Sequence, residues 1–110
     1  MSTRVLVYEP SSRRGVEQQL AGNPHASLKS MQALVGGYIE SYPLTQDGTL
    51  VAILNEDGRG LGLARNQCAA PRFEWVGTFF VARVQDEHYV SLTDADMAVV
   101  RGMFDQPLDA

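Results

Sequence analysis

The sequence predicts an α+β fold, with a mainly antiparallel sheet of four to six strands and two helices packed on one face. Three observations lead to this prediction. Short apolar runs flank the pairs Asp47-Gly48 and Asp57-Gly58, which are typical of tight turns between antiparallel strands. Two other segments carry apolar residues at helical spacing, and both begin behind good helix caps. The chain has 110 residues, so we expect a single domain, 1–110, with one core.

Two strands are expected near the start of the chain. The apolar, β-branched run 4–8 predicts a strand that Pro10 ends, because proline lacks the N–H that a sheet ladder needs. Residues 16–20 fit either one helical turn or an edge strand. We favour the strand because Gly15 and Gly22 bracket these residues closely and leave little room for a helix.

A short helix is expected next. A polar loop over 23–26 leads to Ser27, a good N-cap, and apolar residues then recur at helical spacing over 28–35. Gly36 is able to take the left-handed conformation that ends a helix, and Gly37 lets the chain turn directly into a strand.

The middle of the chain predicts a hairpin. Residues 38–44 alternate in polarity, and Pro43 indicates an edge position or a bulge. The run 49–54 is the most strand-like part of the sequence, and we expect it in the centre of the sheet. Pairing of these two strands would bring Glu40 within a few residues of Asn55.

One more strand is expected in the second half. An extended stretch of small residues at 60–63 and an irregular stretch at 65–74 come first. The strongly apolar run 75–84 predicts the strand, and a polar turn at 85–88 follows it.

A second helix is expected at the end. It begins after Thr93, where Asp96 completes a capping box, and Pro107 ends it. The residues expected in the core are Val5, Val7, Leu28, Met31, Leu34, Ile39, Val51, Ile53, Phe79, Val81, Met97 and Val100.

Composition and charge exclude several classes of protein. Hydrophobic residues make up 45% of the chain and charged residues 20%, which is typical of a globular protein and not of a disordered one. The net charge is −4 with dispersed acids, so we do not expect nucleic acid as a partner. No apolar stretch approaches the roughly 20 residues of a membrane-spanning helix, and no secretory signal is evident. We therefore expect a cytoplasmic protein with no membrane partner.

The sequence assigns no catalytic residue, no metal site and no cofactor. Cys68 is the single cysteine, which excludes an intrachain disulfide and a zinc site made of cysteines, and a packed thiol is favoured over a nucleophile. His25 and His88 lie in separate loops without acidic or histidine partners at ligand spacing.

The best candidate site is a group of polar residues at the ends of the expected strands. Glu40, Asn55, Glu56, Arg65 and Asn66 lie where loops meet the sheet, which is where small proteins often build sites. The functional interpretation is a polar pocket that binds a ligand or a partner. The structural interpretation is that Asn55 and Asp57 satisfy turn amides and that Glu40 pairs with Arg59 or Arg65. Turn preference favours the structural role for Asn55 and leaves both roles open for the two glutamates.

An aromatic element accompanies these residues. Tyr38, Tyr42, Phe73 and Trp75 form a partner-binding patch if they face outward and part of the core if they face inward. Alternation along the strand does not decide between the faces, because Ile39 favours one and the tyrosines favour the other.

Several motifs in the same order resemble domain-of-unknown-function family 3846. They are a helix end followed by a strand (Gln32–Glu40), the turn Asn55–Gly58, the residue Asn66, the strand Gly77–Val81 and the helix entry Ser91–Asp94. The family comprises small proteins of phages, plasmids and other mobile elements, and the resemblance covers most of the chain. It implies an accessory or host-interaction role without an established activity.

We therefore expect a non-enzymatic accessory protein that acts by binding a host protein or itself in the host cytoplasm. Inhibition of a host protein or of a host defence system is one specific form of this role. The residues expected to carry binding are Tyr38, Glu40, Tyr42, Asn55 and Glu56. Arg65 and Asn66 complete this set. The alternative is a protein that binds or sequesters a small molecule or nucleotide. A small hydrolase that uses the two glutamates is the third hypothesis.

Overall fold

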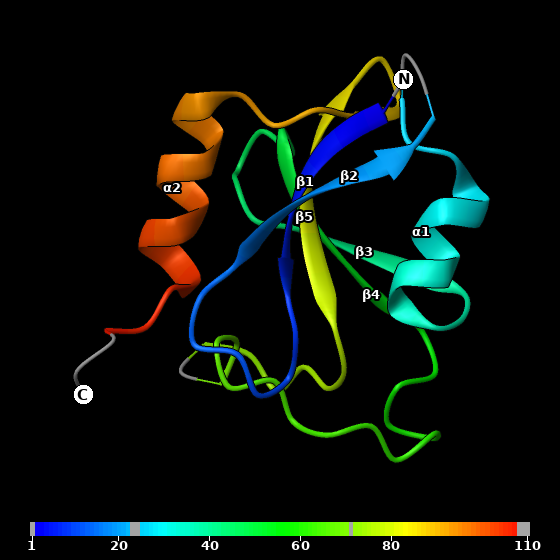
Figure 1. Cartoon of the computed structure of the whole chain (residues 1–110), viewed down its shortest axis with the longest axis vertical. Helices are drawn as coiled ribbons and strands as arrows, with labels where there is room; N and C mark the ends of the chain where they lie inside the picture. Colours follow the sequence, from blue (N-terminus) through cyan, green and yellow to red (C-terminus); the bar gives the residue numbers. More distant parts are fainter. Residues whose placement is uncertain (1, 23–24, 71, 108–110) are drawn as a thin grey trace.

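The computed structural model describes residues 2–22, 25–70 and 72–107 (Figure 1). Asn23 and Pro24 of the predicted loop, and Pro71 of the predicted irregular stretch, lie outside the described residues. The elements in chain order are β1 (Ser2–Tyr8), β2 (Val16–Ala21), α1 (Leu28–Val35), β3 (Ile39–Pro43), β4 (Leu50–Asn55), β5 (Phe79–Gln85), β6 (His88–Val90) and α2 (Asp94–Phe104).

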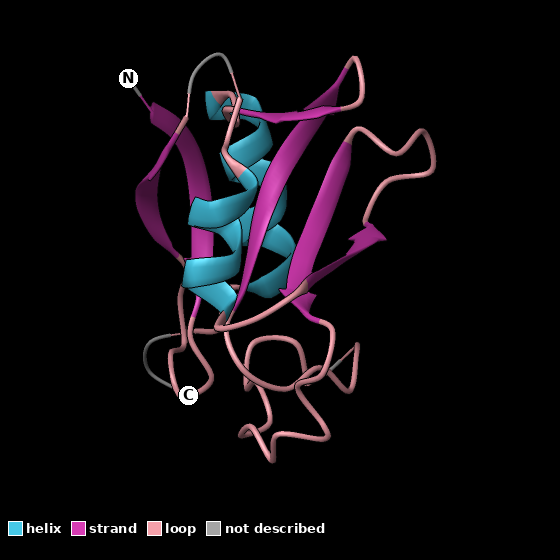
Figure 2. Cartoon of the chain, turned by 90° about the vertical axis from the view of Figure 1, so that its right-hand side faces the viewer, coloured by secondary structure: helices cyan, strands magenta, loops and turns pink. Residues whose placement is uncertain are grey.

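The described strands form one antiparallel six-stranded sheet, which confirms the predicted fold class. The strand order is β2-β1-β5-β4-β3, and β6 pairs with the end of β5. The two edges of this path are therefore β2 and β3. The described part of the long connection between β4 and β5 projects beyond one end of the sheet (Figures 1 and 2).

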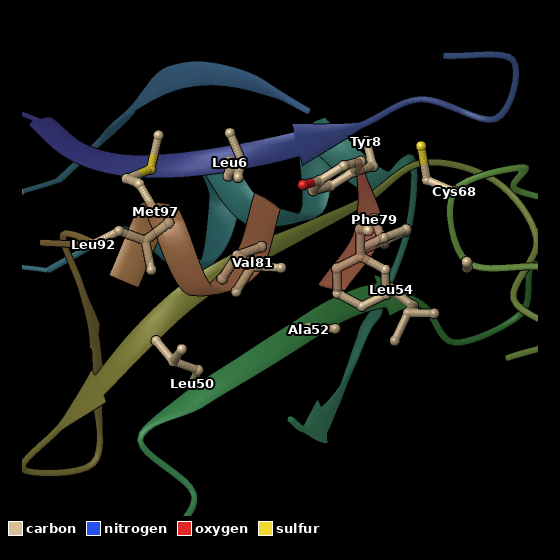
Figure 3. Close-up of a cluster of buried hydrophobic side chains, with 13 residues drawn as sticks. Leu6, Tyr8, Leu50, Ala52, Leu54, Cys68, Phe79, Val81, Leu92 and Met97 are labelled. Carbon is tan, nitrogen blue, oxygen red and sulfur yellow. The ribbon is translucent and has the colours of Figure 1, made fainter. Parts of the chain in front are cut away.

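The two helices cover opposite faces of the sheet, so the prediction that they share one face is wrong (Figure 1). Alternate residues of each central strand enter two separate cores. On β1, Leu6 and Tyr8 pack in the core beneath α2, whereas Val5 and Val7 pack in the core beneath α1. Figure 3 shows the first of these cores. The physical reason is that β1, β4 and β5 are apolar at successive positions, and such strands need cover on both faces.

Four local predictions also need correction. Residues 60–63 form successive turns instead of an extended segment, because Leu61 N donates to the Asp57 carbonyl. The strand predicted at 75–84 begins only at Phe79, since Gly77 has a φ of +77° that interrupts extended backbone. The strand β6 was missed within and after the predicted turn, because three residues are too short to show periodicity. Leu28 is exposed instead of buried, and the other predicted core residues are buried or partly buried.

Helix α1 begins and ends where the sequence predicts. The Ser27 side chain accepts a hydrogen bond from Ser30 N, and Gly36 takes a φ of +82° while its N–H donates to the Gln32 carbonyl. At the other helix, Thr93 and Asp96 form the predicted capping box. These caps fix the directions in which the chain enters and leaves the sheet.

The end of α2 is tied to the sheet by the nearly buried carboxylate of Asp105. Its Oδ1 accepts hydrogen bonds from the Tyr8 hydroxyl at 2.8 Å and from Gly15 N at 2.9 Å. Its Oδ2 lies 3.0 Å from Arg101 and 3.3 Å from Arg14. Burial alone would raise the pKa of Asp105, but the hydrogen bonds from Gly15, Tyr8 and Arg101 outweigh it and lower the pKa. The carboxylate therefore joins the turn after β1 to the last turn of α2.

The replacement Asp105→Asn is expected to lower the free energy of unfolding at pH 7 by about 2 kcal/mol, since a charged acceptor of several hydrogen bonds is lost. Because the folded pKa of Asp105 is lowered, its stabilising contribution is present above about pH 4 and is lost as the pH falls through the folded pKa. Urea unfolding from pH 7 down to about pH 3 should therefore show a shallower acid dependence in the variant. Equal slopes for both proteins would contradict this role, and the exposed Glu9→Gln is the control.

Candidate functional site

An open cleft of about 400 Å³ lies where the ends of β3 and β4 meet the connection to β5. Its polar lining comes from Glu40 on β3, from Asn55 at the end of β4, and from Glu56, Asp57 and Glu74 in the connection. Three of the predicted binding residues therefore meet at one place.

The register between β3 and β4 explains this convergence. Ile39 lies opposite Asn55 and Glu40 opposite Leu54, so the prediction that Glu40 comes close to Asn55 is confirmed. Glu56 N donates to the Tyr38 carbonyl at 2.8 Å, which extends the pairing beyond the end of β4. Opposite residues of an antiparallel pair share a face, so Glu40 stands on the same face as Leu54, which packs beneath α2.

The side chain of Asn55 takes part in a turn and a helix end. It is buried on the α1 side, where its Nδ2 donates to the Val35 carbonyl at 3.0 Å and its Oδ1 accepts from Asp57 N at 2.8 Å. A Cβ at Gly37 would lie 2.9 Å from the Asn55 Nδ2, so only glycine allows this close approach. Asn55 thus holds the end of α1 to the end of β4 and places the backbone from which Glu56 projects.

Asn66 and Arg65 do not line the cleft. Asn66 is fully buried, and its Nδ2 donates to the Tyr8 and Gly77 carbonyls, both at 3.0 Å. Its Oδ1 accepts from the N–H groups of Cys68 and Ala69 at 3.1 and 3.2 Å. Arg65 is exposed, and its backbone forms an isolated bridge with Val76. Asn66 therefore supports the cleft by holding the connection against the end of β1.

An aromatic cluster lies beside β3, and one of its members, Trp75, lines the cleft. Phe73 and Trp75 stack with their ring centroids 4.2 Å apart, and Tyr42 meets both rings edge-on at 5.1 and 5.5 Å. Trp75 also contacts Phe79 of the core. Tyr42 is nevertheless 45% exposed and Tyr38 is 68% exposed, so the tyrosines present rings to solvent.

The outer side of β3 presents backbone groups that no described strand pairs. The Tyr38 carbonyl accepts from Glu56 N, and Leu44 N donates to the Leu50 carbonyl, so even-numbered residues direct their N–H and C=O groups toward β4. The odd-numbered residues Ile39 and Ser41 therefore direct theirs outward. Pro43 falls in the same outward register, where its missing N–H costs no bond to β4, and the predicted edge position is confirmed.

The charges of the cleft are mainly negative. Among the described residues that line the cleft, Arg59 alone is cationic. Its Nη2 donates to the Glu74 carbonyl at 3.0 Å and lies 3.7 Å from the Glu74 carboxylate. Both side chains are mostly exposed, at 72% and 81%, so this ion pair is weak. Four carboxylates and one guanidinium leave the cleft attractive to cations.

Sequence reasoning missed part of this lining. Glu74 lies in an irregular stretch without periodicity, so no signal in the sequence places it beside Glu40. Asp57 was interpreted only as a turn residue, although it also lines the cleft. Among the described residues, no group of three or more histidine, cysteine or acidic side chains is arranged to hold a metal ion.

A protein-family model describes most of the chain. It is the model of a domain of unknown function (DUF3846), and it matches residues 2–105. The chain belongs to the DUF3846 family. No significant match was found among curated proteins or among solved structures.

In this DUF3846 member, the motif residues on which the resemblance rests divide into two groups. Gly37, Asn55 and Asn66 are buried or partly buried and hold the cleft in shape. Glu40 and Glu56 are exposed on its surface. No helix in the described part of the chain is long and apolar enough to cross a membrane.

Proposed function

We propose that this DUF3846 protein is a non-enzymatic accessory protein that takes up an extended segment of a partner protein along the outer edge of β3. The observation that carries this proposal is the row of outward N–H and C=O groups at Ile39 and Ser41, flanked by the exposed rings of Tyr38 and Tyr42. Backbone pairing supplies affinity in such strand addition, and neighbouring side chains supply specificity. Exposed tyrosines at an edge are typical of interface residues.

The family setting supports a host protein as the partner. The resemblance to small proteins of phages, plasmids and mobile elements makes interaction with a protein of the host cytoplasm the expected role. Inhibition would follow if the segment bound along β3 is one that the host protein needs.

The chemistry of the cleft favours this function over the two alternatives. A nucleotide would bring negative charge to a lining that holds four carboxylates, and Arg65 is not part of that lining. A hydrolase needs a nucleophile or a base with an orienting partner. The described lining offers exposed carboxylates but no histidine, serine or cysteine.

Amide hydrogen exchange tests strand addition directly. In the protein alone, Ser41 N–H should exchange quickly, whereas Glu40 and Tyr42 N–H should exchange slowly because they bond to β4. The probes are short synthetic peptides that alternate valine with serine, arginine or glutamate. Binding of a peptide should slow exchange at Ser41 by at least roughly tenfold.

The opposite edge provides an internal control. Arg4, opposite Gln19, directs its N–H to Ser91 and its C=O to Leu92 N, so Gln19 directs its own groups away from β1. Exchange at Gln19 should stay fast with every peptide. Unchanged exchange at Ser41 with all three peptides, or equal slowing at both edges, would overturn strand addition at β3.

A further inference from the structure

Four acidic residues lie together at the cleft beside β3. Of the thirteen acidic residues, four line the cleft, and all four are exposed. Glu40 belongs to β3 itself, and Glu56 follows the neighbouring strand. A segment added to β3 would lie one strand spacing, about 4.8 Å, from the backbone that carries Glu40. Side chains of that segment would therefore lie nearest to Glu40, whereas Glu56, Asp57 and Glu74 lie toward β4 and the connection.

Only alternate residues of an added strand can reach the cleft. Side chains that lie opposite one another on adjacent strands share a face of the sheet. Glu40 and Tyr42 stand on the face that α2 covers. The other face of β3 carries Ile39, which packs against the core beneath α1, together with Ser41 and Pro43. One face of the added strand would meet Glu40 and the ring of Tyr42, and the other would meet Ile39, Ser41 and Pro43.

Tyr42 adds a second feature that favours a cation. Its ring is held by edge contacts to Phe73 and Trp75, yet 45% of the residue remains exposed. A guanidinium or ammonium group over such a ring gains a cation–π contribution, and a ring that is already held loses little freedom on binding. Arg59, the one cation in the described part of the lining, is weakly paired at 3.7 Å with Glu74 and leaves most of the negative charge unmatched.

We propose that the segment bound along β3 is a basic, extended peptide of a partner protein that alternates arginine or lysine with apolar residues. This inference rests on the proposed function and names the chemistry of its partner. The basic side chains face Glu40, Tyr42 and the cleft, and the apolar side chains face Ile39.

A second copy of the chain is a poorer occupant. If two β3 strands paired about Ser41, Glu40 would lie opposite Tyr42 of the copy and would meet no cation there. Opposite charges across a pair of strands stabilise it. A basic segment therefore complements Glu40 better than a second β3 does.

The test compares the three alternating peptides by the fluorescence of Trp75, the only tryptophan, and by amide shifts along β3. The arginine–valine peptide should bind about tenfold more tightly than the serine–valine peptide, which corresponds to about 1.4 kcal/mol. The glutamate–valine peptide should bind more weakly than both. The preference for arginine should shrink as salt is raised, because exposed charges are screened.

A pair of double variants with equal net charge completes the test. Glu40→Gln with Glu56→Gln should remove most of the preference for the arginine peptide, whereas Glu9→Gln with Glu17→Gln should retain it. Equal binding of the arginine and glutamate peptides, or equal effects of the two double variants, would overturn the basic-segment inference and leave strand addition standing. If no peptide shifts the amides of β3, strand addition itself fails and this inference fails with it.

Discussion

The variant Asn66→Ala is expected to be the most destabilised single-residue variant among those proposed for this protein. Its side chain makes four hydrogen bonds to backbone groups, and the residue has no exposed surface. Removing the amide would leave two carbonyls and two N–H groups without these partners. At about 1 to 3 kcal/mol for each unsatisfied buried group, offset by local relaxation, the loss should be about 3 to 5 kcal/mol. Such a loss is a large part of the stability of a small domain.

Urea unfolding followed by Trp75 fluorescence measures this loss, because the Trp75 carbonyl accepts from Asn66 N and the ring lies in the same connection. The matched control is Asn55→Ala, which removes two side-chain hydrogen bonds and should cost about 1 to 2 kcal/mol. If Asn66→Ala left stability within about 0.5 kcal/mol of wild type but abolished peptide binding, the supporting role would be contradicted.

The variant Asn66→Asp separates the hydrogen bonds that the Asn66 side chain accepts from those that it donates. It keeps acceptors for Cys68 and Ala69 N–H but removes both donors to the Tyr8 and Gly77 carbonyls. The carboxylate should therefore be destabilising at pH 7, and protonation in acid should restore one donor. The free energy of unfolding of Asn66→Asp should therefore differ less from that of wild type at low pH than at neutral pH. This result is expected if position 66 is buried and needs a hydrogen-bond donor.

The parts of the fold that local chemistry controls could be predicted from the sequence. Ser27, Gly36 and Thr93 lie at helix ends as predicted, because capping depends on residues within one turn of the cap. The turn at Asp47-Gly48 joins β3 and β4 as predicted, since Asp-Gly pairs favour tight turns. Pro43 predicts an edge strand because proline lacks the N–H that an interior strand needs.

The face on which each helix packs could not be predicted in the same way. A strand such as β4, which is buried at every position, gives no alternation from which to choose a face. The strand β4 lies inside the sheet as the sequence predicts, and it needs cover on both faces because every position is buried. Each helix covers one face of the sheet, so each core forms from residues far apart in the chain.

The candidate site shows the same division. The approach of Glu40 to Asn55 follows from hairpin register and was predicted, whereas the outward exposure of Tyr42 depends on Phe73 and Trp75 in a connection with no periodic pattern. Asn55 and Asn66 are among the predicted binding residues because polar residues at strand ends are common in sites, although turn preference favours a structural role for Asn55. Their hydrogen bonds show that they hold the backbone that presents Glu40 and Glu56.

The largest expected effect on binding comes from Ser41→Pro. Ser41 directs its N–H away from β4, so proline there removes no hydrogen bond from the β3–β4 ladder. A carbonyl of the incoming strand would lose the Ser41 N–H as its hydrogen-bond donor. The proline ring would also stand between β3 and the incoming strand. Affinity for the arginine–valine peptide should fall at least about tenfold, while the free energy of unfolding should change by no more than roughly 1 kcal/mol.

The matched control for Ser41→Pro is Gln19→Pro, which places the same residue in the outward register of the other edge strand, β2. It should leave peptide affinity unchanged. Titration of both variants with the same peptide, together with urea unfolding of each, distinguishes loss of pairing from loss of structure. Undiminished binding by a folded Ser41→Pro would place the peptide on side chains alone and contradict strand addition. If both proline variants bound the peptide weakly at wild-type stability, the binding site would not be confined to β3, because a proline on β2 would also have weakened binding.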